Sequence, residues 1–447
     1  MAFDDVDPLA RVDKALEARF PTRMVPDLDR ITDLLDLLGE PQRAFPSIHI
    51  TGTNGKTSTA RMIDALLREL GLRTGRYTSP HLESVTERIC VDGQPLTAER
   101  FAEVYDEVAP FAEIVDGRHA DRVTFFELLT AMGFAAFADA PVDAAVVEVG
   151  LGGRWDATNV IHAPVAVVTP ISLDHVGILG STIEEIAAEK AGLIHEGAAV
   201  VCAVQPEAAV AVLVERAAEV GATIVAEGLT FGVRSRSVAV GGQLLELQGL
   251  AGVYEEVFLP LHGAHQATNA ACALAAVEAF LGAADREPLD ADAVRAAFAG
   301  VSSPGRLEVV RRSPTVLIDG AHNPAGAAAL AAALEDEFTF DRLVAVVAIL
   351  GDKDAAGVLA ELEPVVTSVV ATTNGSPRAL SAAELGAVAT EVFGEDRVEV
   401  VQRLDDAIDV AVQRAEADAA VGGAGVIVTG SIVTVGEARH LLRGSSA

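Results

Sequence analysis

The sequence contains little cysteine and no long apolar run. Its three cysteines, Cys90, Cys202 and Cys272, are scattered and lack the spacing of a metal site. We therefore expect reduced thiols in a cytoplasmic protein. No uninterrupted apolar run reaches membrane-spanning length, and no basic segment precedes an apolar stretch near the N-terminus. The sequence thus predicts neither a membrane span nor a secretory signal.

The chain also has few positively charged residues. The chain has 33 Lys and Arg against 65 Asp and Glu, a formal net charge of −32. Such a surface repels phosphate backbones and anionic lipid, so we expect neither a nucleic-acid nor a membrane partner. A local site can still be positive on an acidic protein, so nucleotide binding remains open. Hydrophobic residues make up 50% of the 447, enough for two or three buried cores.

Short β-branched runs alternate with helical patterns in the first part of the chain. Strands are predicted over 47–50, 143–149, 164–169 and 198–204, and helices over 57–70 and 182–194. This alternation predicts a parallel sheet covered by helices. Between residues 229 and 261, short runs separated by glycine predict a small antiparallel insertion. Ala-rich patterns then predict helices over 264–280 and 291–299.

A glycine-rich segment, TGTNGKTS at residues 51–58, lies between a predicted strand and a predicted helix. Its glycines let backbone N–H groups approach phosphate oxygens, and the helix N-terminus adds positive partial charge. Lys56 is placed to neutralise the β- and γ-phosphates, and the Thr57 hydroxyl to reach Mg²⁺. The loop is shorter than the general phosphate-loop pattern, because its first glycine is Gly52. An ordinary glycine turn is the alternative, which the strand–loop–helix context disfavours.

The segment SSPGR at residues 302–306 has the chemistry of a linker, since Pro and Gly break the preceding helix. We therefore place one domain at 1–302 and a second at 303–447. Strands in the second domain are predicted over 316–318, 343–349, 365–371, 398–401 and 425–429. The expected fold class is α/β, with an N-terminal P-loop ATPase-type parallel-sheet domain and a smaller C-terminal Rossmann-like domain.

The short phosphate loop resembles that of the Mur ligase superfamily. The segment EVGLGGRWDATN at 148–159 is similar to the folylpolyglutamate synthase signature, which usually has Leu where this chain has Trp155. Six further segments occur in the order of that family: SPHL at 79–82, DH at 174–175, EKAG at 189–192, HQATN at 265–269, PGRLE at 304–308 and DGAHNP at 319–324. The resemblance covers nearly the whole chain.

That resemblance implies an ATP-dependent ligase. The expected reaction adds L-glutamate, γ-linked, to the carboxylate of tetrahydrofolate through an acyl phosphate. Dihydropteroate is a second candidate acceptor. The nucleotide contacts that the resemblance implies are Thr53, Asn54, Gly55, Lys56, Thr57, Ser58, Asn269, Arg306 and Asp319.

Glu148 ends a predicted buried strand beside the phosphate loop. A buried carboxylate is costly unless it meets a cation, and Mg²⁺ is one. The resemblance implies two Mg²⁺ ions, with a monovalent cation as a further candidate. The implied metal ligands are Thr57, Ser79, Glu148, His175 and Lys190, and the implied catalytic residues are Lys56, His175 and Lys190. As a metal ligand Lys190 would be carbamylated. Taken alone, His175 is more often structural, and Lys190 could be a solvated helix lysine.

The two remaining substrates have expected contacts of their own. For folate the resemblance implies Asp29, Arg30, Phe125, Arg154 and Asp156, and for glutamate His322, Lys353 and Ser431. Phe125 offers a face to a flat heterocycle, with core packing as the alternative. A surface charge cluster is the alternative for Lys353.

Two rival functions remain open at this point. One is a Mur-type amino-acid ligase that acts on a cell-wall precursor with the same phosphate loop. The other is a non-catalytic nucleotide-binding regulator, against which the presence of Glu148, His175 and Lys190 beside the loop speaks. The leading expectation is a cytoplasmic monomer that acts on small molecules.

Overall fold

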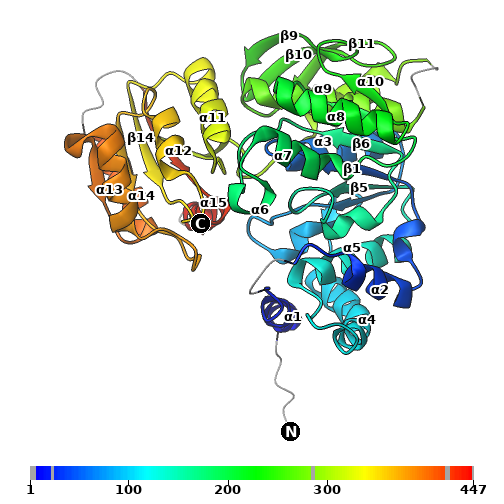
Figure 1. The fold of residues 1–447 in the computed structure, drawn as a ribbon. Coiled ribbons are helices and arrows are strands. Elements are labelled where there is room, and N and C mark those ends of the chain that lie inside the picture. The colour runs from blue at the N-terminus through cyan, green and yellow to red at the C-terminus, as the bar shows by residue number, and fades with distance from the viewer. Residues whose placement is uncertain (1–6, 22–24, 283–286, 418–422, 445–447) are drawn as a thin grey trace.

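The computed structural model describes residues 7–21, 25–282, 287–417 and 423–444. They form two α/β bodies that lie side by side in Figure 1, with the later residues, in yellow to red, on the left. The first body contains an eight-stranded and a three-stranded sheet, and the second a six-stranded sheet. The predicted fold class is confirmed. The chain passes between the bodies after α10, where the linker was expected; the boundary at 302/303 stays a prediction.

The eight-stranded sheet has the order β4-β3-β2-β5-β1-β6-β7-β8. Its strands are β1 Ser47–Thr51, β2 Thr74–Tyr77, β3 Ile89–Val91, β4 Gln94–Pro95, β5 Ala144–Glu148, β6 Val165–Val168, β7 Ala199–Cys202 and β8 Thr223–Ala226. In the part of the sheet ordered β2-β5-β1-β6-β7-β8, neighbouring strands pair in parallel, as predicted. The strands β3 and β4 add an antiparallel edge. The phosphate loop follows the central strand β1, so its neighbours β5 and β6 end beside it.

Helices cover both faces of this sheet. They are α1 Pro8–Glu17, α2 Asp29–Leu37, α3 Lys56–Glu69, α4 Ala98–Asp116, α5 Phe125–Asp139, α6 Val176–Leu179, α7 Ile183–Ala191, α8 Glu207–Glu219, α9 Ala264–Phe280 and α10 Ala291–Ala299. One core joins α3, α9 and α10 to Ile48 and Ile50 of β1, and the opposite face packs on α5 through Ala145 and Val147 of β5. Because both faces are covered, the strands are apolar throughout, as in parallel sheets generally.

The predicted antiparallel insertion is a three-stranded sheet with the order β11-β10-β9. Its strands are β9 Gly232–Ala239, β10 Gly242–Gln248 and β11 Val253–Leu259. In Figure 1 it lies at the top of the first body, over α9 and α10. Its apolar side chains join the core that holds α9, and so it fixes the helix that carries Asn269.

The second body is a six-stranded sheet with the order β12-β13-β17-β14-β15-β16. Its elements are β12 Glu308–Arg312, β13 Thr315–Ile318, α11 Pro324–Glu337, β14 Arg342–Val347, α12 Ala355–Leu362, β15 Ser368–Ala371, α13 Ala382–Phe393, β16 Val398–Val400, α14 Leu404–Glu416, β17 Ala424–Thr429 and α15 Ile432–Gly444. The five predicted strands are present, and β12 is an additional antiparallel edge strand. Within the described ranges, no helix has the length and apolar character needed to cross a membrane.

Candidate active site between the two bodies

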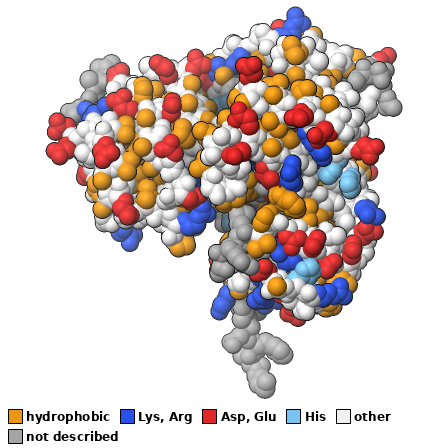
Figure 2. Space-filling view, in the orientation of Figure 1, with side chains coloured by type: hydrophobic (Ala, Val, Ile, Leu, Met, Phe, Trp, Pro, Cys, Tyr) orange, Lys and Arg blue, Asp and Glu red, His pale blue; other side chains and the backbone are white. Residues whose placement is uncertain are grey.

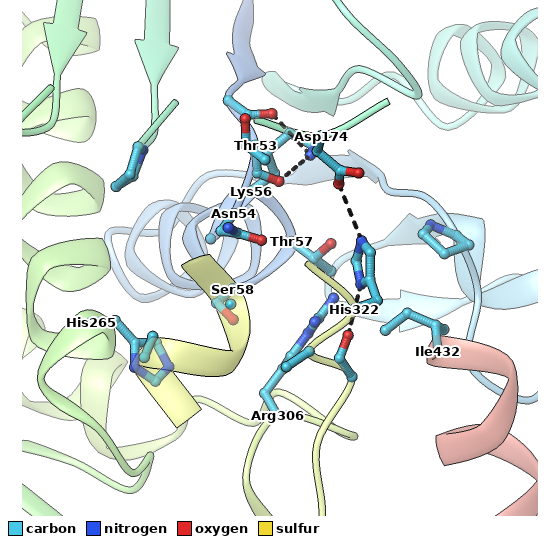
Figure 3. Close-up of a pocket in the computed structure, with 18 of the residues that line it drawn as sticks. Thr53, Asn54, Lys56, Thr57, Ser58, Asp174, His265, Arg306, His322 and Ile432 are labelled. Carbon is cyan, nitrogen blue, oxygen red and sulfur yellow. Dashed lines mark hydrogen bonds and ion pairs between the residues drawn. The ribbon is translucent and has the colours of Figure 1, made fainter. Parts of the chain in front are cut away.

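A cavity of about 590 Å³ lies between the two bodies. Every residue predicted to contact nucleotide, metal or glutamate lines it: Thr53, Asn54, Gly55, Lys56, Thr57, Ser58, Ser79, Glu148, His175, Lys190, Asn269, Arg306, Asp319, His322, Lys353 and Ser431. Figure 3 shows side chains of the phosphate loop on one side and Arg306, His322 and Ile432 of the second body on the other. Loops at the carboxyl ends of strands from both sheets therefore meet in one space.

The phosphate loop requires glycine at Gly52, where φ is +140° and an added Cβ would lie 1.9 Å from Thr169 Oγ1. The loop curls around Lys56, whose Nζ donates to the carbonyls of Gly52 and Thr53 at 3.1 Å each. Burial lowers the pKa of Lys56, and the nearby charge of Glu148 opposes that shift. The ammonium group of Lys56 is therefore positioned to contact a phosphate group that binds in the loop.

Glu148, at the end of β5, meets the start of α3. The Thr57 hydroxyl donates to both carboxylate oxygens, at 2.9 and 3.0 Å, and the Ser79 amide donates to one of them at 3.3 Å. Burial raises the pKa of Glu148, while the charge of Lys56 lowers it. The Thr57 hydroxyl and the Glu148 carboxylate thus bring together oxygen atoms of the kind that Mg²⁺ prefers, and Ser79 lies beside them.

His175 and Lys190, the other predicted metal ligands, have different partners. Lys190 Nζ donates to the Gly52 carbonyl at 2.8 Å, and His175 Nε2 lies 3.1 Å from Lys353 Nζ. The pKa of Lys190 is lowered to about 7, first by burial and then by the nearby charge of Lys56. Within the described part of the chain, no group of three or more His, Cys, Asp or Glu side chains is placed to hold a metal. The two-metal assignment therefore stays a prediction.

A polar network centred on Asp174 joins the bodies, although the sequence analysis gave this residue no role. Asp174 Oδ1 lies 2.5 Å from Lys353 Nζ, and Asn323 Nδ2 donates to Oδ2 at 3.0 Å. Asn323 and Asn54 also exchange amide hydrogen bonds of 3.1 Å. Burial alone would raise the pKa of Asp174, but a hydrogen bond from His322 and the neighbouring positive charges hold it far below its usual range.

The linker and α9 close the other side of the cavity. Ser58 Oγ lies 3.0 Å from Ser303 Oγ, which ties the phosphate loop to the linker. Asn269 lies so close to the loop that a Cβ added at Gly55 would be 2.5 Å from its Oδ1. Asp319 accepts from the amides of Leu307 and Ala321, at 2.8 Å each, and so holds the linker. Its predicted nucleotide contact remains untested.

A second cavity of about 520 Å³ adjoins the first, and both are lined by Ser79, Pro80, Gly150 and Leu151. Three of the predicted folate contacts line it, namely Arg30, Phe125 and Asp156. Asp29 and Arg154 are exposed and lie on the wall of neither cavity. Their roles stay predictions without support from the geometry.

The polar and aromatic side chains that line this second cavity are held in place by contacts with other residues of the protein. Arg30 makes a two-pronged pair with the buried Glu127, at 2.8 and 3.2 Å. The Phe125 ring stacks on Phe20, with centroids 4.3 Å apart. Asp156 accepts from the amides of Leu151 and Thr158, and burial raises its pKa. The sequence analysis did not single out Phe20, which lies far from Phe125 in the chain.

Comparison with known proteins shows the family and the fold of the chain. The family models for the Mur ligase middle domain and the Mur ligase glutamate ligase domain match residues 50–277 and 305–432. A dihydrofolate synthase/folylpolyglutamate synthase of Mycobacterium tuberculosis is 54% identical, covering 98% of this chain and 94% of that protein. The Mycobacterium tuberculosis folylpolyglutamate synthase complexed with ADP and AMPPCP has a TM-score of 0.93 at 54% identity, with 98% and 99% of the two chains covered. Escherichia coli FolC in complex with DHPP and ADP has a TM-score of 0.85 at 32% identity, with both chains covered fully, 100% each.

Proposed function

The chain belongs to the dihydrofolate synthase/folylpolyglutamate synthase family of Mur ligases, and we propose that its interdomain cavity joins L-glutamate to a tetrahydrofolate or dihydropteroate carboxylate. It is an ATP-dependent acid–amino-acid ligase. Neither rival function is favoured, because the relatives that match over most of their length are ligases of folate metabolism. We retain the cytoplasmic location as a proposal, supported by three free, buried cysteines, and the monomeric state as a second proposal.

The observation that carries the proposal is that the residues expected to contact nucleotide and glutamate, and three of the five expected to contact folate, line two adjoining cavities. The phosphate loop and Asn269 border the first cavity from one body, and His322, Lys353 and Ser431 border it from the other. The second cavity shares a wall with it at Ser79 and Pro80. A flat heterocycle in the second cavity can therefore extend its carboxylate into the first.

The reaction then proceeds in two steps. The acceptor carboxylate attacks the γ-phosphorus of ATP, the bond to the β-phosphate oxygen breaks, and an acyl phosphate and ADP form. The free amine of glutamate next attacks the acyl carbon, and the tetrahedral intermediate releases one N–H proton to water and expels phosphate to leave an amide. Lys56 and Arg306 offset the negative charge that grows during transfer, and the remaining contacts supply position.

We infer that Mg²⁺ binds at Thr57, Ser79 and Glu148. Thr57 and Glu148 fit the ion because the Thr57 hydroxyl contacts the buried, otherwise costly negative charge of Glu148, and Ser79 borders that charge through its amide. Bound there, Mg²⁺ would neutralise phosphate charge. His175 and Lys190 are the proposed ligands of a second ion.

Lys190 fits the proposed modification because it is buried and has a pKa of about 7, lowered first by burial. A neutral amine reacts with carbon dioxide, forming a C–N bond and losing one proton, to give a carbamate. That reaction replaces a positive charge by an anionic oxygen ligand suited to Mg²⁺.

ADP release measured with tetrahydrofolate, methylene-tetrahydrofolate or dihydropteroate tests the function. Release is expected only when ATP, an acceptor and L-glutamate are all present, and the preferred acceptor names the main activity. A uridine-diphosphate-linked muramoyl acceptor is the matched control for the cell-wall reaction. ADP release with that acceptor, or without any acceptor, would contradict the proposal.

A further inference from the structure

A series of buried hydrogen bonds runs from the central strand β1 to the wall of the second cavity. His49 of β1 has its Nε2 2.8 Å from the hydroxyl oxygen of Thr158, and that hydroxyl donates to Asp156 Oδ1 at 2.5 Å. Thr158 belongs to a short 3-10 helix, η3 Ala157–Val160, and Asp156 lines the second cavity. His49 and Thr158 are 0% exposed and line neither cavity. The cavity wall is therefore connected to a histidine deep in the sheet.

His49 occupies a position where an apolar side chain would be expected. Its neighbours Ile48 and Ile50 belong to the core beneath α3 and α9, so His49 faces the opposite side of the sheet. A buried polar group is costly unless it is hydrogen-bonded. Within the described part of the chain, His49 Nδ1 has no hydrogen-bond partner. The bond to Thr158 is thus the polar contact that the imidazole ring makes.

The Thr158 hydroxyl fixes the direction of the series. It has a single proton, and because that proton goes to Asp156, the oxygen accepts from His49. His49 therefore carries its own proton on Nε2. The opposite direction would require a protonated Asp156 and would leave an N–H at Nδ1 buried without an acceptor, which is costly. The pKa of His49 is lowered to about 3, first by burial and then by the charge of His195, so the ring is neutral near pH 7.

Asp156 is the end of this series and its contact with the cavity. Besides the Thr158 hydroxyl, it accepts from the amides of Thr158 at 3.0 Å and Leu151 at 2.8 Å. Burial raises the pKa of Asp156, and the bond from the Thr158 hydroxyl is the largest effect that opposes this rise. A protonated Asp156 would present a donor where the carboxylate presents only acceptors. The hydrogen-bonding character of the cavity wall thus depends on the hydroxyl, whose orientation depends on His49.

We propose that His49 is a positioning residue for the acceptor substrate: through Thr158 it keeps Asp156 an ionised acceptor for the N–H donors of the heterocycle. This inference rests on the proposed function, which places the heterocycle in the second cavity. Tetrahydrofolate and dihydropteroate both carry an exocyclic amino group beside a ring N–H, and a carboxylate accepts strongly from such donors. His49 itself touches no substrate and takes no proton in the reaction.

Kinetics of the full-length enzyme test this role, with tetrahydrofolate and dihydropteroate as acceptors. Thr158→Val removes the hydroxyl and should raise the acceptor KM by roughly tenfold, the effect of losing a hydrogen bond to a charged group. His49→Met should have a similar effect, and His49→Gln, which restores an N–H near the position of Nε2, should recover most of the loss. The kcat and the KM for ATP should remain at the wild-type values. Combining Thr158→Val with His49→Met should raise the acceptor KM no further, because both changes interrupt one series.

An acceptor that lacks one donor gives a readout that a loss of packing would not change. In the 2-desamino-2-methyl analogue of tetrahydrofolate, a methyl group replaces the exocyclic amino group and the ring N–H remains. The wild type should prefer tetrahydrofolate to this analogue by roughly tenfold or more. The preference should shrink toward one in Thr158→Val and His49→Met and return in His49→Gln.

Tyr77→Phe is the matched control. Tyr77 and His49 both pair with Val147 of β5 and so face the same side of the sheet, and the Tyr77 hydroxyl lies 3.2 Å from Thr130 Oγ1. The change removes a buried hydroxyl that lines neither cavity, and it should keep the wild-type KM and preference.

A measurement on the wild type covers the case in which the variants fold poorly. Nitrogen-15 spectra of the histidine side chains should show a neutral ring with its proton on Nε2 for His49, identified by the signal that is missing in His49→Gln or, if that variant does not fold, by its lack of titration near neutral pH. A proton on Nδ1, or a charged ring, overturns the inference. Wild-type acceptor KM and preference in both Thr158→Val and His49→Met also overturn it. Absence of acceptor-dependent ADP release in the wild type would instead overturn the proposed function.

Discussion

Glu148 shows how much of the site depends on one side chain. Both of its oxygens accept from Thr57, it is buried, and it ends the strand beside the phosphate loop. Since the carboxylate is the one formal negative charge in the Thr57–Ser79–Glu148 group, its replacement by an amide should weaken the metal more than any change in the neutral donors.

We expect Glu148→Gln to raise the Mg²⁺ concentration for half-maximal ADP release by roughly tenfold to a hundredfold, a typical loss around a metal site. A magnesium titration at saturating ATP measures the effect. Glu227→Gln is the control, because Glu227 lines the same cavity but accepts from the Val204 amide. Overlapping titration curves for Glu148→Gln and the wild type would remove Glu148 from the metal site.

Lys190 should give the enzyme a requirement for carbon dioxide that depends on pH. Its pKa is lowered from 10.5 to about 7, so the neutral amine fraction grows as the pH rises through 7. Enzyme freed of carbon dioxide should lose activity, and bicarbonate should restore more of it at about pH 8 than at about pH 6, because the carbamate forms from the neutral amine. ADP release after each treatment provides the measurement.

Lys190→Ala should be nearly inactive and partly rescued by a short carboxylate in solution. Lys14→Ala, a change at an exposed lysine of α1, should leave the bicarbonate response unaltered. Full activity of Lys190→Ala without any added carboxylate would argue against the carbamate.

Sequence reasoning at this scale can locate a residue in a contiguous motif, but it misses a residue whose partners are distant in the sequence. Lys56 and Thr57 could be placed in the phosphate loop because strand, loop and helix are consecutive, and their roles stay predictions. Asp174 was passed over, although its neighbour His175 was singled out, because its partners Lys353 and Asn323 lie 179 and 149 residues away. Only the meeting of two sheets brings these three together.

The phosphate loop has a backbone conformation that a side chain at Gly52 would disrupt. A side chain at Gly52 would meet both an unfavourable φ of +140° and Thr169, at 1.9 Å from its Oγ1. The loop would have to leave β1 earlier, and this would move the Gly52 carbonyl that Lys56 and Lys190 both contact.

Gly52→Ala should therefore lower the melting temperature and weaken ADP binding together, with a stability loss of roughly 1–3 kcal/mol from the strained conformation. Calorimetric unfolding and ADP titration measure the two effects. Gly300→Ala is a suitable comparison, because that glycine has a φ of −88° and the atoms nearest to an added Cβ would lie 3.6 Å from it. Unchanged stability and ADP affinity in Gly52→Ala would show that the loop tolerates a side chain.

Elements in which apolar residues recur with a clear helical period were predicted well. The helix expected over 264–280 is α9, and Thr182 with Glu185 forms the capping box that starts α7. The edge strands β3, β4 and β12 were missed because they are short or half exposed and lack a continuous apolar run. Edge strands form through pairing with a neighbour, which a local pattern does not record.

At the scale of the whole molecule, the acidic residues are distributed over the surface rather than clustered in one patch. Figure 2 shows acidic side chains scattered over both bodies on the face in view. A net charge of −32 makes the compact state repel itself, and salt screens interactions between exposed charges.

We expect the melting temperature to rise by a few degrees as sodium chloride is added to a low-salt buffer, since screening relieves this repulsion. Differential scanning calorimetry of nucleotide-free enzyme in EDTA makes the measurement, with the chelator removing any contribution from divalent ions. A melting temperature that falls steadily from the lowest salt concentration would mean that attractive surface pairs outweigh the repulsion.

The two-body architecture was predictable because a linker separates two runs of alternating strands and helices. The way the bodies meet was not, since it depends on contacts such as Asn54 with Asn323 and Glu83 with Arg439, which pair residues 269 and 356 positions apart. The second cavity was likewise beyond a local pattern, because its wall combines Phe20 with Phe125 and Asp156.

The lysines that border the interdomain cavity have a practical consequence. The chain contains four lysines, and three of them, Lys56, Lys190 and Lys353, line that one cavity, whereas Lys14 is exposed on α1. Reagents that acylate or reductively alkylate primary amines thus have few side-chain targets elsewhere. Modification at Lys56, Lys190 and Lys353 should therefore report on occupancy of the cavity, whereas the exposed Lys14 should react whether or not a ligand is bound.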